Sequence, residues 1–538
     1  MITNFLLFAI LIYGCFIKFK KYIYYFQQNL YNENNRYLKW CKQNLKNIFS
    51  IDDLIVFIIT ILNIFSNNWI TTILKIIAII LIYMDIYITN YYFSDQQKKL
   101  KKKFTLTQRI KRLCFTAIII TLILIALFII NKNLQSYLIL LEYLLFTFNF
   151  FAIYLIGLIN LPIEKIIYYL YWYKARNKLN KMKNLQIIGI TGSYGKTSSK
   201  NIINEILNSK FLCRPSPKNY NTDTGLMITI NNYLNNLDEI FIAEMGAYCP
   251  GRIKNACNLV KPNIGVLTTI GKAHLETFGS EENIIKTKFE LIESLPQNGI
   301  AFLNANDPKQ VNYKLKKKVK TIWYGVENNK ADFNAFDIKC DYKGSNFKVY
   351  FKKEDITANF ETKLLGTHNI SNLIAGISIG YTLGITIDEL INAVKRIQPI
   401  EHRLELKRLG NIYQIDDAYN SNPIGAQKAL EVLNNMPGIK IVVTPGMVEL
   451  GDDEVKENEI FGENIAKVAD YVILVGEKRT KPIYNGLTKQ GFKNDKIIIV
   501  NDVRLSYNII RKLKTDTKDI YALYENDLPD IYDEEVKK

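Results

Sequence analysis

The pattern of hydrophobic positions divides the chain into an apolar N-terminal part and an alternating C-terminal part. Four apolar runs occupy Ile2–Ile17, Leu54–Ile88, Leu113–Ile130 and Tyr137–Leu161. About 20 apolar residues cross a bilayer, and the second run is interrupted at residues 66–68, so it predicts two helices joined by a tight turn. The sequence therefore predicts a transmembrane region of about five helices over residues 1–162.

A cleaved signal peptide is the alternative for the first run, Ile2–Ile17. Its basic residues follow the apolar segment instead of preceding it, and no Ala-x-Ala cleavage site appears. A signal peptide has the opposite order of charge and a small-residue site. The pattern therefore favours a retained span.

Basic and neutral loops alternate between the predicted spans. The loop 18–53 holds seven Lys and Arg residues and the loop 94–112 holds eight, whereas the connections 66–69 and 131–136 together hold only Lys132. Short cytoplasmic loops are rich in Lys and Arg. With five spans, we expect a multi-pass plasma-membrane protein with its N-terminus outside and everything after Leu161 in the cytoplasm. A solvated charge run is the alternative for Lys98–Lys103, but it does not account for the alternation.

Two ionisable residues, Lys75 and Glu142, fall inside predicted spans. A charge within the membrane is by default a hint of function. A position near the interface, or a side chain that snorkels towards it, is the interpretation that we favour for both.

The C-terminal part predicts parallel sheets with crossover helices. Residues 163–185 carry basic and apolar residues that predict an amphipathic connector lying on a surface. Short apolar strands then alternate with helical segments, as in α/β proteins. The expected strands are Gln186–Thr191, Glu239–Glu244, Ile264–Thr268, Ile300–Asn304, Tyr413–Asp416, Ile439–Thr444, Tyr471–Val475 and Lys496–Val500. Polar–apolar alternation between Lys330 and Leu365 predicts an antiparallel patch, and a boundary near Pro399 gives domains over 186–399 and 400–538.

Charge and cysteine content exclude two classes of function. Of the net charge of +18, residues 1–185 contribute +16 and the rest of the chain +2, so the basic excess belongs to the apolar part. We therefore expect no nucleic-acid partner, because such a partner needs a basic patch on the folded domain. The seven cysteines form no CxxC pair, which indicates neither a disulfide framework nor a zinc site.

A glycine-containing loop with Lys and Thr follows the first expected strand. The segment Gly189-Ile-Thr-Gly-Ser-Tyr-Gly-Lys-Thr197 precedes a helix with apolar residues on one face. In such a P-loop, backbone N–H groups surround phosphate oxygens, a Lys neutralises the β/γ-phosphates and a Thr hydroxyl holds Mg²⁺. The match to GxxxxGK[ST] is imperfect, because Ile190 stands where that pattern needs Gly, and a chance Gly-Lys-Thr is the alternative.

The variant Thr-Gly-Ser-x-Gly-Lys-Thr resembles the phosphate loop of the Mur ligase family, whose members join amino acids or peptides to cell-wall precursors. Further segments from Gln186 onwards resemble the family in its order along the chain. They are Asn219–Gly225, Glu244–Ala247, Thr268–Gly279, Lys286–Leu291, Asn304–Asp307, Gly366–Asn372, Glu401–Arg403 and Asp416–Pro423. The resemblance implies a P-loop central ATPase domain and a Rossmann-like C-terminal domain, both α/β, after the α-helical transmembrane region.

The resemblance also implies roles for residues. ATP and Mg²⁺ are the implied cofactors, and the reaction is amide-bond formation through an acyl phosphate. The implied catalytic residues are Lys196, Glu244, His274 and Lys288, and the metal ligands are Thr197, Glu244, His274 and Lys288. Lysine is a cation and cannot bind a metal, so Lys288 acts as a ligand only if it is carbamylated. A phosphate-pairing or surface lysine is the alternative for Lys288, and a hydrogen-bonded loop histidine for His274.

Nucleotide and substrate contacts are implied in the same way. The nucleotide-binding set is Gly192, Ser193, Gly195, Lys196, Thr197, Ser198, Asn369, Asn372, Arg403 and Asp417. Asn369 and Asn372 are three apart, share one helix face, and are implied to contact adenine, whereas His368 is expected to orient or cap. The substrate-binding set is Asn219, Asn221, Thr222, Tyr419, Asn420 and Asn422. A helix-capping turn is the alternative for the segment from Tyr419 to Pro423.

Two of these segments, Glu244–Ala247 and Asp416–Pro423, most resemble the members that add D-alanyl-D-alanine to a UDP-N-acetylmuramoyl tripeptide. One departure is serious, because membrane spans stand where such members carry a small UDP-binding domain. The substrate is therefore a UDP-muramoyl peptide, a lipid-linked precursor, or a different carboxylate and amine. A membrane transporter driven by the P-loop and a catalytically inactive scaffold are the alternatives from other classes, and neither needs the later segments.

Overall fold

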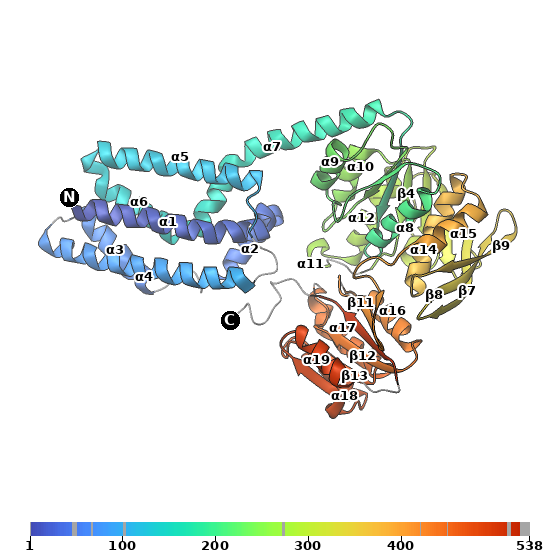
Figure 1. Cartoon of the computed structure of the whole chain (residues 1–538). Coiled ribbons are helices and arrows are strands. Elements are labelled where there is room, and N and C mark those ends of the chain that lie inside the picture. Colours follow the sequence, from blue (N-terminus) through green and yellow to red (C-terminus); the bar gives the residue numbers. More distant parts are fainter. Residues whose placement is uncertain are drawn as a thin grey trace. The chain divides into compact units, whose positions relative to one another are not determined.

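The computed structural model describes residues 2–45, 51–65, 68–99, 104–271, 275–419, 421–448, 450–513 and 518–527. His274 and Asn420, two of the expected site residues, lie outside these ranges. The chain separates into two compact units, Met1–Tyr169 and Leu170–Lys538. The first unit is helical and the second is built on two β-sheets (Figure 1).

The helical unit contains the apolar runs of the sequence. Its α-helices are α1 (Ile2–Gln28), α2 (Arg36–Gln43), α3 (Ile51–Phe65), α4 (Trp69–Lys99), α5 (Gln108–Ile130), α6 (Gln135–Thr147) and the start of α7 (Asn149–Lys181). Four segments are long and apolar enough to cross a membrane: Ile2–Gln28, Trp69–Ser94, Gln108–Ile130 and Asn149–Lys181. The shorter α3 is also apolar, and the expected break near residues 66–68 separates it from α4.

The expectation of one continuous helix over Tyr137–Leu161 is wrong. The helix breaks at Phe148, between α6 and α7. The Asn149 side chain donates to the carbonyl of Cys15 on α1, at 3.3 Å from Nδ2 to O. Asn149 is the first residue of α7, and short polar residues such as Asn favour helix ends over helix interiors.

Ionisable side chains lie inside the helical unit. Lys18 of α1 pairs with Asp85 of α4, with 2.7 Å between Nζ and Oδ2, and its ammonium lies 3.9 Å from the centre of the Phe146 ring. Lys75 and Glu142 are 1% and 3% exposed. Both side chains are therefore packed within the helical unit, which does not fit snorkelling, whereas their position near the interface stays a prediction.

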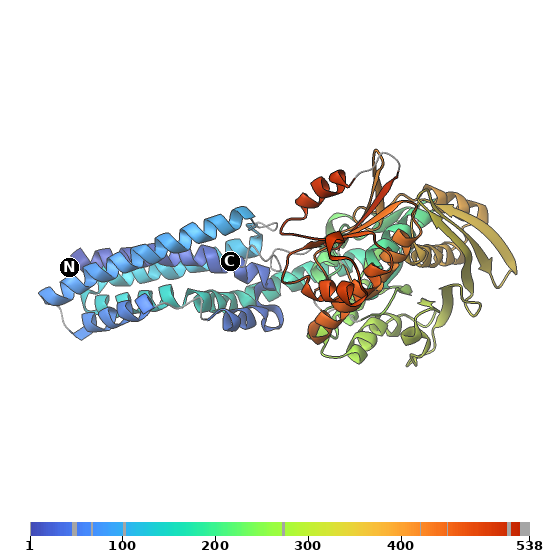
Figure 2. The ribbon, with the colours of Figure 1, turned by 90° about the horizontal axis from the view of Figure 1, so that it is seen from below.

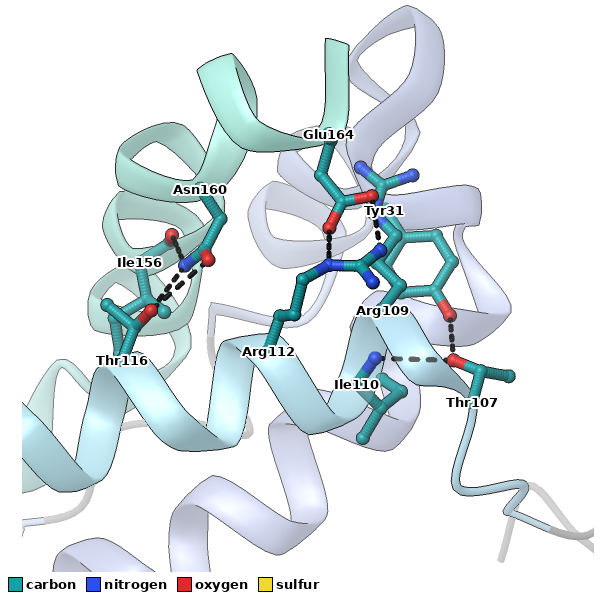
Figure 3. Close-up of polar contacts among 9 residues, drawn as sticks. All are labelled: Tyr31, Thr107, Arg109, Ile110, Arg112, Thr116, Ile156, Asn160 and Glu164. Carbon is teal, nitrogen blue, oxygen red and sulfur yellow. Dashed lines mark hydrogen bonds and ion pairs between the residues drawn. The ribbon is translucent and has the colours of Figure 1, made fainter. Parts of the chain in front are cut away.

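A polar network joins α5, α7 and the segment after α1 (Figure 3). Arg112 donates to both carboxylate oxygens of Glu164, from Nε at 2.6 Å and from Nη2 at 2.8 Å. Arg109 lies against the Tyr31 ring, whose hydroxyl bonds to Thr107, the N-cap of α5. Arg109 and Arg112 lie in the first turns of α5, so these contacts are at the end of that helix opposite to its turn into α6.

The larger sheet of the second unit has nine strands in the order β2-β3-β1-β4-β5-β6-β7-β8-β9. The strands β1 (Gln186–Thr191), β2 (Cys213–Pro215), β3 (Ile240–Glu244), β4 (Ile264–Leu267), β5 (Ile300–Asn304) and β6 (Lys320–Val326) are parallel. Next, β7 (Phe333–Asp341), β8 (Gly344–Phe351) and β9 (Ile356–Thr362) form the expected antiparallel patch. β1, at the centre of the parallel part, carries the glycine-containing loop at its end.

Helices cover both faces of this sheet. On one face, α8 (Lys196–Leu207), α14 (Thr367–Thr382) and α15 (Ile387–Arg396) share an apolar core with the strands. On the other face lie α9 (Asp223–Asn232), α10 (Arg252–Val260) and α12 (Glu281–Glu293). The end of α7 joins this second core through the buried Ala175 and Leu179. The connector is therefore a helix continuous with the last apolar segment, and its far end packs into the α/β unit.

The smaller sheet has the order β10-β11-β15-β12-β13-β14. It is formed by the orange and red part of the chain (Figure 2). Its strands are β10 (Glu405–Leu409), β11 (Ile412–Asp417), β12 (Ile439–Thr444), β13 (Tyr471–Val475), β14 (Ile497–Val500) and β15 (Ile520–Glu525). Only the β10–β11 pair is antiparallel among the described pairs. The helices α16 (Pro423–Asn434), α17 (Glu454–Ala466) and α18 (Lys481–Lys489) cover one face, and α19 (Arg504–Lys512) covers the other.

Eight expected strands coincide with observed ones to within one residue at each end, and β2, β6, β10 and β15 were not expected. The missed β15 is fully buried along its length and lies at the centre of its sheet. A short apolar run of this kind has no alternation that distinguishes a buried strand from a helical segment.

Candidate functional site

Hydrogen bonds and close contacts with neighbouring residues fix the backbone conformation of the loop between β1 and α8. Ser193 N donates to Thr269 O at 2.8 Å, and Ser193 Oγ donates to Gly271 O at 2.8 Å. Gly195 has φ of +79°, which favours glycine. A Cβ at Gly192 would collide with the Thr268 hydroxyl. The backbone therefore needs glycine at both positions, and the loop leads directly into the N-terminus of a helix, where anions bind.

Lys196, Thr197 and Glu244 lie together at the end of this loop. The Lys196 ammonium donates to the carbonyls of Gly192 and Ser193, at 2.8 and 2.9 Å. Burial lowers the pKa of Lys196 to about 8; Glu244 acts in the opposite direction, and Arg403 lowers it further. Thr197 Oγ1 donates to Glu244 Oε1 at 3.1 Å. The cation, the hydroxyl and the carboxylate thus come from the ends of two adjacent parallel strands, β1 and β3.

Lys288 is a buried lysine on α12, on the other face of the sheet from α8. It is 3% exposed and its ammonium lies 5.8 Å from the centre of the Phe278 ring. Burial lowers its pKa well below the ordinary value, and Lys196 lowers it in the same direction. The alternative of a surface lysine is therefore wrong for Lys288. His274, its expected partner, lies outside the described residues.

The start of α14 brings two expected asparagines next to the loop. Asn372 accepts a hydrogen bond from Ser199 of α8 at 2.8 Å, and its Oδ1 lies beside Gly195. Asn369 donates to the carbonyl of Leu365 at 2.9 Å. Burial lowers the pKa of His368 to about 4, with Lys428 and Arg403 acting in the same direction, so this imidazole is neutral at pH 7. Asn369 and Asn372 are buried and His368 is half-buried, and the bond from Ser199 joins Asn372 to α8.

Arg403 and Asp417 contribute charges from the C-terminal domain. The Arg403 guanidinium lies 4.3 Å from the centre of the Tyr419 ring. Asp417 Oδ1 accepts from Leu404 N at 3.2 Å, and burial raises the pKa of Asp417 to about 6. The positive charge of Arg403 acts on the pKa of Lys196, so the two cations are near enough to interact electrostatically.

The expected substrate-binding residues have different local roles. Asn221 Nδ2 donates to Glu244 Oε1 at 3.1 Å, so it belongs to the same cluster. Thr222 caps α9 and Asn422 caps α16, each by accepting from a backbone N–H group. Ser198 and Asn219 have no described side-chain bond to the cluster, although Ser198 is buried at the start of α8. A capping role does not test whether Thr222 and Asn422 contact the substrate, so these contacts stay predictions. Asn420 lies outside the described residues.

The structure adds three residues that sequence reasoning missed. Lys200 pairs with Glu244 Oε2 at 3.0 Å. Its spacing of four from Lys196 predicts only that both lysines share one face of α8, and it does not identify Glu244 as the partner. Glu525, at the end of β15, lies beside Asp417 and accepts from Ser421 Oγ at 2.6 Å. Asp307 accepts from Ile270 N at 2.8 Å and so holds the segment before residues 272–274. The contacts of Glu525 and Asp307 form only in the folded chain, so the sequence has no local pattern that predicts them.

Comparison with known protein families gives the class. The Mur ligase middle domain matches residues 190–380, and the domain described as Mur ligase, glutamate ligase domain matches residues 402–520. Together the two matches cover more than half of the chain. The chain therefore belongs to the Mur ligase family, with an N-terminal helical extension. Members of this family are ATP-dependent ligases that form peptide bonds.

Similar curated proteins narrow the type within the family. The chain is 32% identical over 299 residues to the UDP-N-acetylmuramoyl-tripeptide--D-alanyl-D-alanine ligase of Buchnera aphidicola subsp. Baizongia pistaciae. The aligned region covers 54% of this chain and 63% of the relative. It is 31% identical over 273 residues to the enzyme of the same name from Bacillus subtilis, covering 50% of this chain and 58% of the relative. The chain thus spans less than two thirds of the length of these relatives.

Solved structures show the same fold. MurF ligase from Thermotoga maritima in complex with ADP is 28% identical, with a TM-score of 0.60, and the match covers 67% of this chain and 80% of that one. MurF from Acinetobacter baumannii gives a TM-score of 0.60 at 22% identity, covering 67% and 77%. The α/β unit therefore has the Mur ligase fold.

Proposed function

We propose that the chain is an ATP-dependent ligase that forms an amide bond through an acyl phosphate. The observation that carries the proposal is the cluster of Lys196 and Thr197, at the start of α8, with Glu244 at the end of β3. Asn372 lies beside the same loop, and the charge of Arg403 acts on Lys196. Its substrates are a UDP-N-acetylmuramoyl tripeptide, or a lipid-linked equivalent, and D-alanyl-D-alanine. The product belongs to peptidoglycan precursor synthesis.

The reaction has two steps with defined bonds. A carboxylate oxygen of the tripeptide attacks the γ-phosphorus of ATP, and ADP leaves. The amine of the dipeptide then attacks the acyl carbon, phosphate leaves, and the amine loses a proton. The first step brings two anions together, and fixed cations relieve their repulsion without reorganisation. Lys196 and Arg403 supply these charges.

The residues present fit Mg²⁺ and a nucleotide. Thr197 and Glu244 offer a hydroxyl and a carboxylate, the oxygen ligands that Mg²⁺ prefers, and Lys196 lies beside them. When bound, Mg²⁺ neutralises charge on the phosphates. The loop residues Gly192, Ser193 and Gly195 would surround the phosphates, with Ser198 at the start of the helix. Asn369 and Asn372 would face adenine, and Asp417 the ribose.

Lys288 has the environment that carbamylation requires. Only a neutral amine reacts with carbon dioxide, and burial favours the neutral form of Lys288. The carbamate would give an anionic oxygen ligand for a second Mg²⁺, together with His274. The residues Asn219, Thr222, Tyr419, Asn420 and Asn422 remain our proposed contacts to substrate.

The helical unit supports a position at the plasma membrane. Apolar side chains point outwards from its long helices, including Leu122 and Ile123 of α5 at 59% and 54% exposed. Exposed apolar area on this scale marks a surface that meets another apolar phase. We propose five crossings, with α6 and the start of α7 as the fifth, which would put the basic loops and the ligase domains in the cytoplasm. A lipid-linked precursor is a substrate that such an anchored ligase would meet.

A steady-state assay of the full-length protein in detergent tests the proposal. ADP release should require both UDP-N-acetylmuramoyl tripeptide and D-alanyl-D-alanine. Lys196→Ala and Glu244→Ala should each lower kcat by about 10²-fold or more, the scale on which such electrostatic groups act. The control Lys395→Ala removes one partner of an exposed ion pair with Glu361 and should leave kcat unchanged.

Other outcomes point to other functions. ADP release that needs neither substrate would favour a P-loop-driven transporter. Release that needs a different carboxylate or amine would keep the ligase and change its substrates. Near-normal turnover of Lys196→Ala or Glu244→Ala would overturn the site.

A further inference from the structure

Lys200 contacts the carboxylate that we propose as a metal ligand, yet no role has been assigned to it above. Its ammonium lies 3.0 Å from Glu244 Oε2, and the two side chains are only 2% and 1% exposed. A carboxylate buried this deeply is costly unless a cation compensates it. The Lys196 ammonium bonds instead to carbonyls of the loop.

The two oxygens of Glu244 have separate partners. Oε1 accepts from Thr197 Oγ1 and from Asn221 Nδ2, each at 3.1 Å, whereas Oε2 faces Lys200. The oxygen next to Thr197 is the one that a cation held by Thr197 would meet. Lys200 therefore turns the carboxylate so that one oxygen is presented to the phosphate loop.

Lys200 also contacts the segment before Asn221. It donates to the carbonyl of Lys218 at 2.7 Å. Lys218 has φ of +46°, a conformation that is uncommon for a residue with a side chain, so its backbone is held there by its contacts. One ammonium thus links α8, Glu244 and the loop that carries Asn219 and Asn221.

We propose that Lys200 is a positioning residue of the nucleotide–metal site: it fixes Glu244 so that a single carboxylate oxygen receives the divalent cation that accompanies the nucleotide. This inference rests on the proposed function, because it takes Thr197 and Glu244 as the residues that hold the cation. Groups that orient a metal ligand change metal affinity by about 10- to 100-fold when removed. Lys200 should therefore affect the contribution of Mg²⁺ to nucleotide binding more than nucleotide binding itself.

Calorimetric titration of ADP into the full-length protein, with and without Mg²⁺, tests this inference. Mg²⁺ should increase ADP affinity in the wild type. In Lys200→Met the increase should fall by about tenfold or more, while ADP affinity without Mg²⁺ changes by less than about twofold. Lys200→Gln, which can still donate to the Lys218 carbonyl but carries no charge, should lose the same increase. Lys395→Met removes an exposed lysine of a surface pair and should change neither affinity.

Three outcomes would contradict the inference. Full retention of the Mg²⁺ effect in both Lys200 variants would overturn it while leaving the proposed function intact. An equal loss of affinity with and without Mg²⁺ in the folded Lys200→Gln protein would assign Lys200 to the stability of the loop alone. A wild-type protein that binds no ADP under either condition would overturn the proposed function and this inference together.

Discussion

At the scale of single residues, the C-terminal domain contains a buried carboxyl pair beside the proposed acceptor loop. Asp417 and Glu525 face each other across β11 and β15, and Ser421 donates to Glu525. Burial raises the pKa of Glu525 well above its usual range, and that of Asp417 to about 6. The folded protein therefore holds protons on this pair at a pH at which the unfolded chain has released them.

This pair predicts a pH dependence of stability. The unfolded carboxyls lose their protons near pH 4, and the folded pair loses its first proton at higher pH. Because the folded state binds more protons in this window, the free energy of unfolding falls as pH rises from about 4 to about 6. Glu525→Gln removes one ionisation and should make this fall smaller. Urea denaturation of wild type and variant between these pH values measures the difference, and equal slopes would contradict the account.

At the scale of elements, α5 and α7 are joined at one end of the helical unit by Arg112 and Glu164 (Figure 3). A second contact between the same helices runs from Asn160 to Thr116 at 2.9 Å. Pro162 lies inside α7 between these two contacts. A proline interrupts the helical hydrogen bonds, and the flanking contacts hold the helix where its own bonding is weakened.

Glu164→Gln should therefore destabilise the helical unit. The change removes the negative charge that Arg109 and Arg112 share, and both arginine side chains are partly buried. We expect a loss of about 1–2 kcal/mol, which is between the values for surface and buried ion pairs. Thermal unfolding in detergent measures it. The control Glu361→Gln, at an exposed pair with Lys395, should have little effect, and equal melting temperatures for both variants would contradict this role.

Much of the element pattern could be predicted, because it depends on local chemistry. Apolar runs such as Ile439–Thr444 predicted strands at the observed positions, and the glycines of the loop after β1 predicted where the candidate site lies. The break at Phe148 and the pairing of Lys200 with Glu244 depend on partners from other helices and strands. A single sequence does not indicate which residue, distant along the chain, will be the partner of a polar side chain in the core. Such contacts became visible only once the elements were packed.

At the scale of the whole molecule, the chain joins the two Mur ligase domains to an N-terminal helical extension, which we propose to be a membrane anchor. The α/β unit matches the Mur ligase domains, whereas the helical unit precedes the matched ranges. The chain thus combines the two domains that carry the proposed chemistry with apolar helices that are long enough to cross a membrane. The proposed topology explains why basic residues gather in two of its loops.

Accessibility of introduced cysteines tests that topology. In a variant without native cysteines, Asn133→Cys lies in the exposed turn after α5, and Lys39→Cys lies in α2. A membrane-impermeant maleimide added to intact cells should label position 133, and it should label position 39 only after the cells are permeabilised. The reverse pattern would place the ligase domains outside, where no ATP is supplied.

The acyl phosphate itself is the central claim, and isotope transfer tests it most directly. The tripeptide substrate is prepared with ¹⁸O in the carboxylate that forms the amide and is incubated with ATP, D-alanyl-D-alanine and the full-length protein. Attack of that carboxylate on ATP predicts that one ¹⁸O atom appears in each phosphate released. Phosphate that is released without ¹⁸O while ATP is consumed would contradict the account.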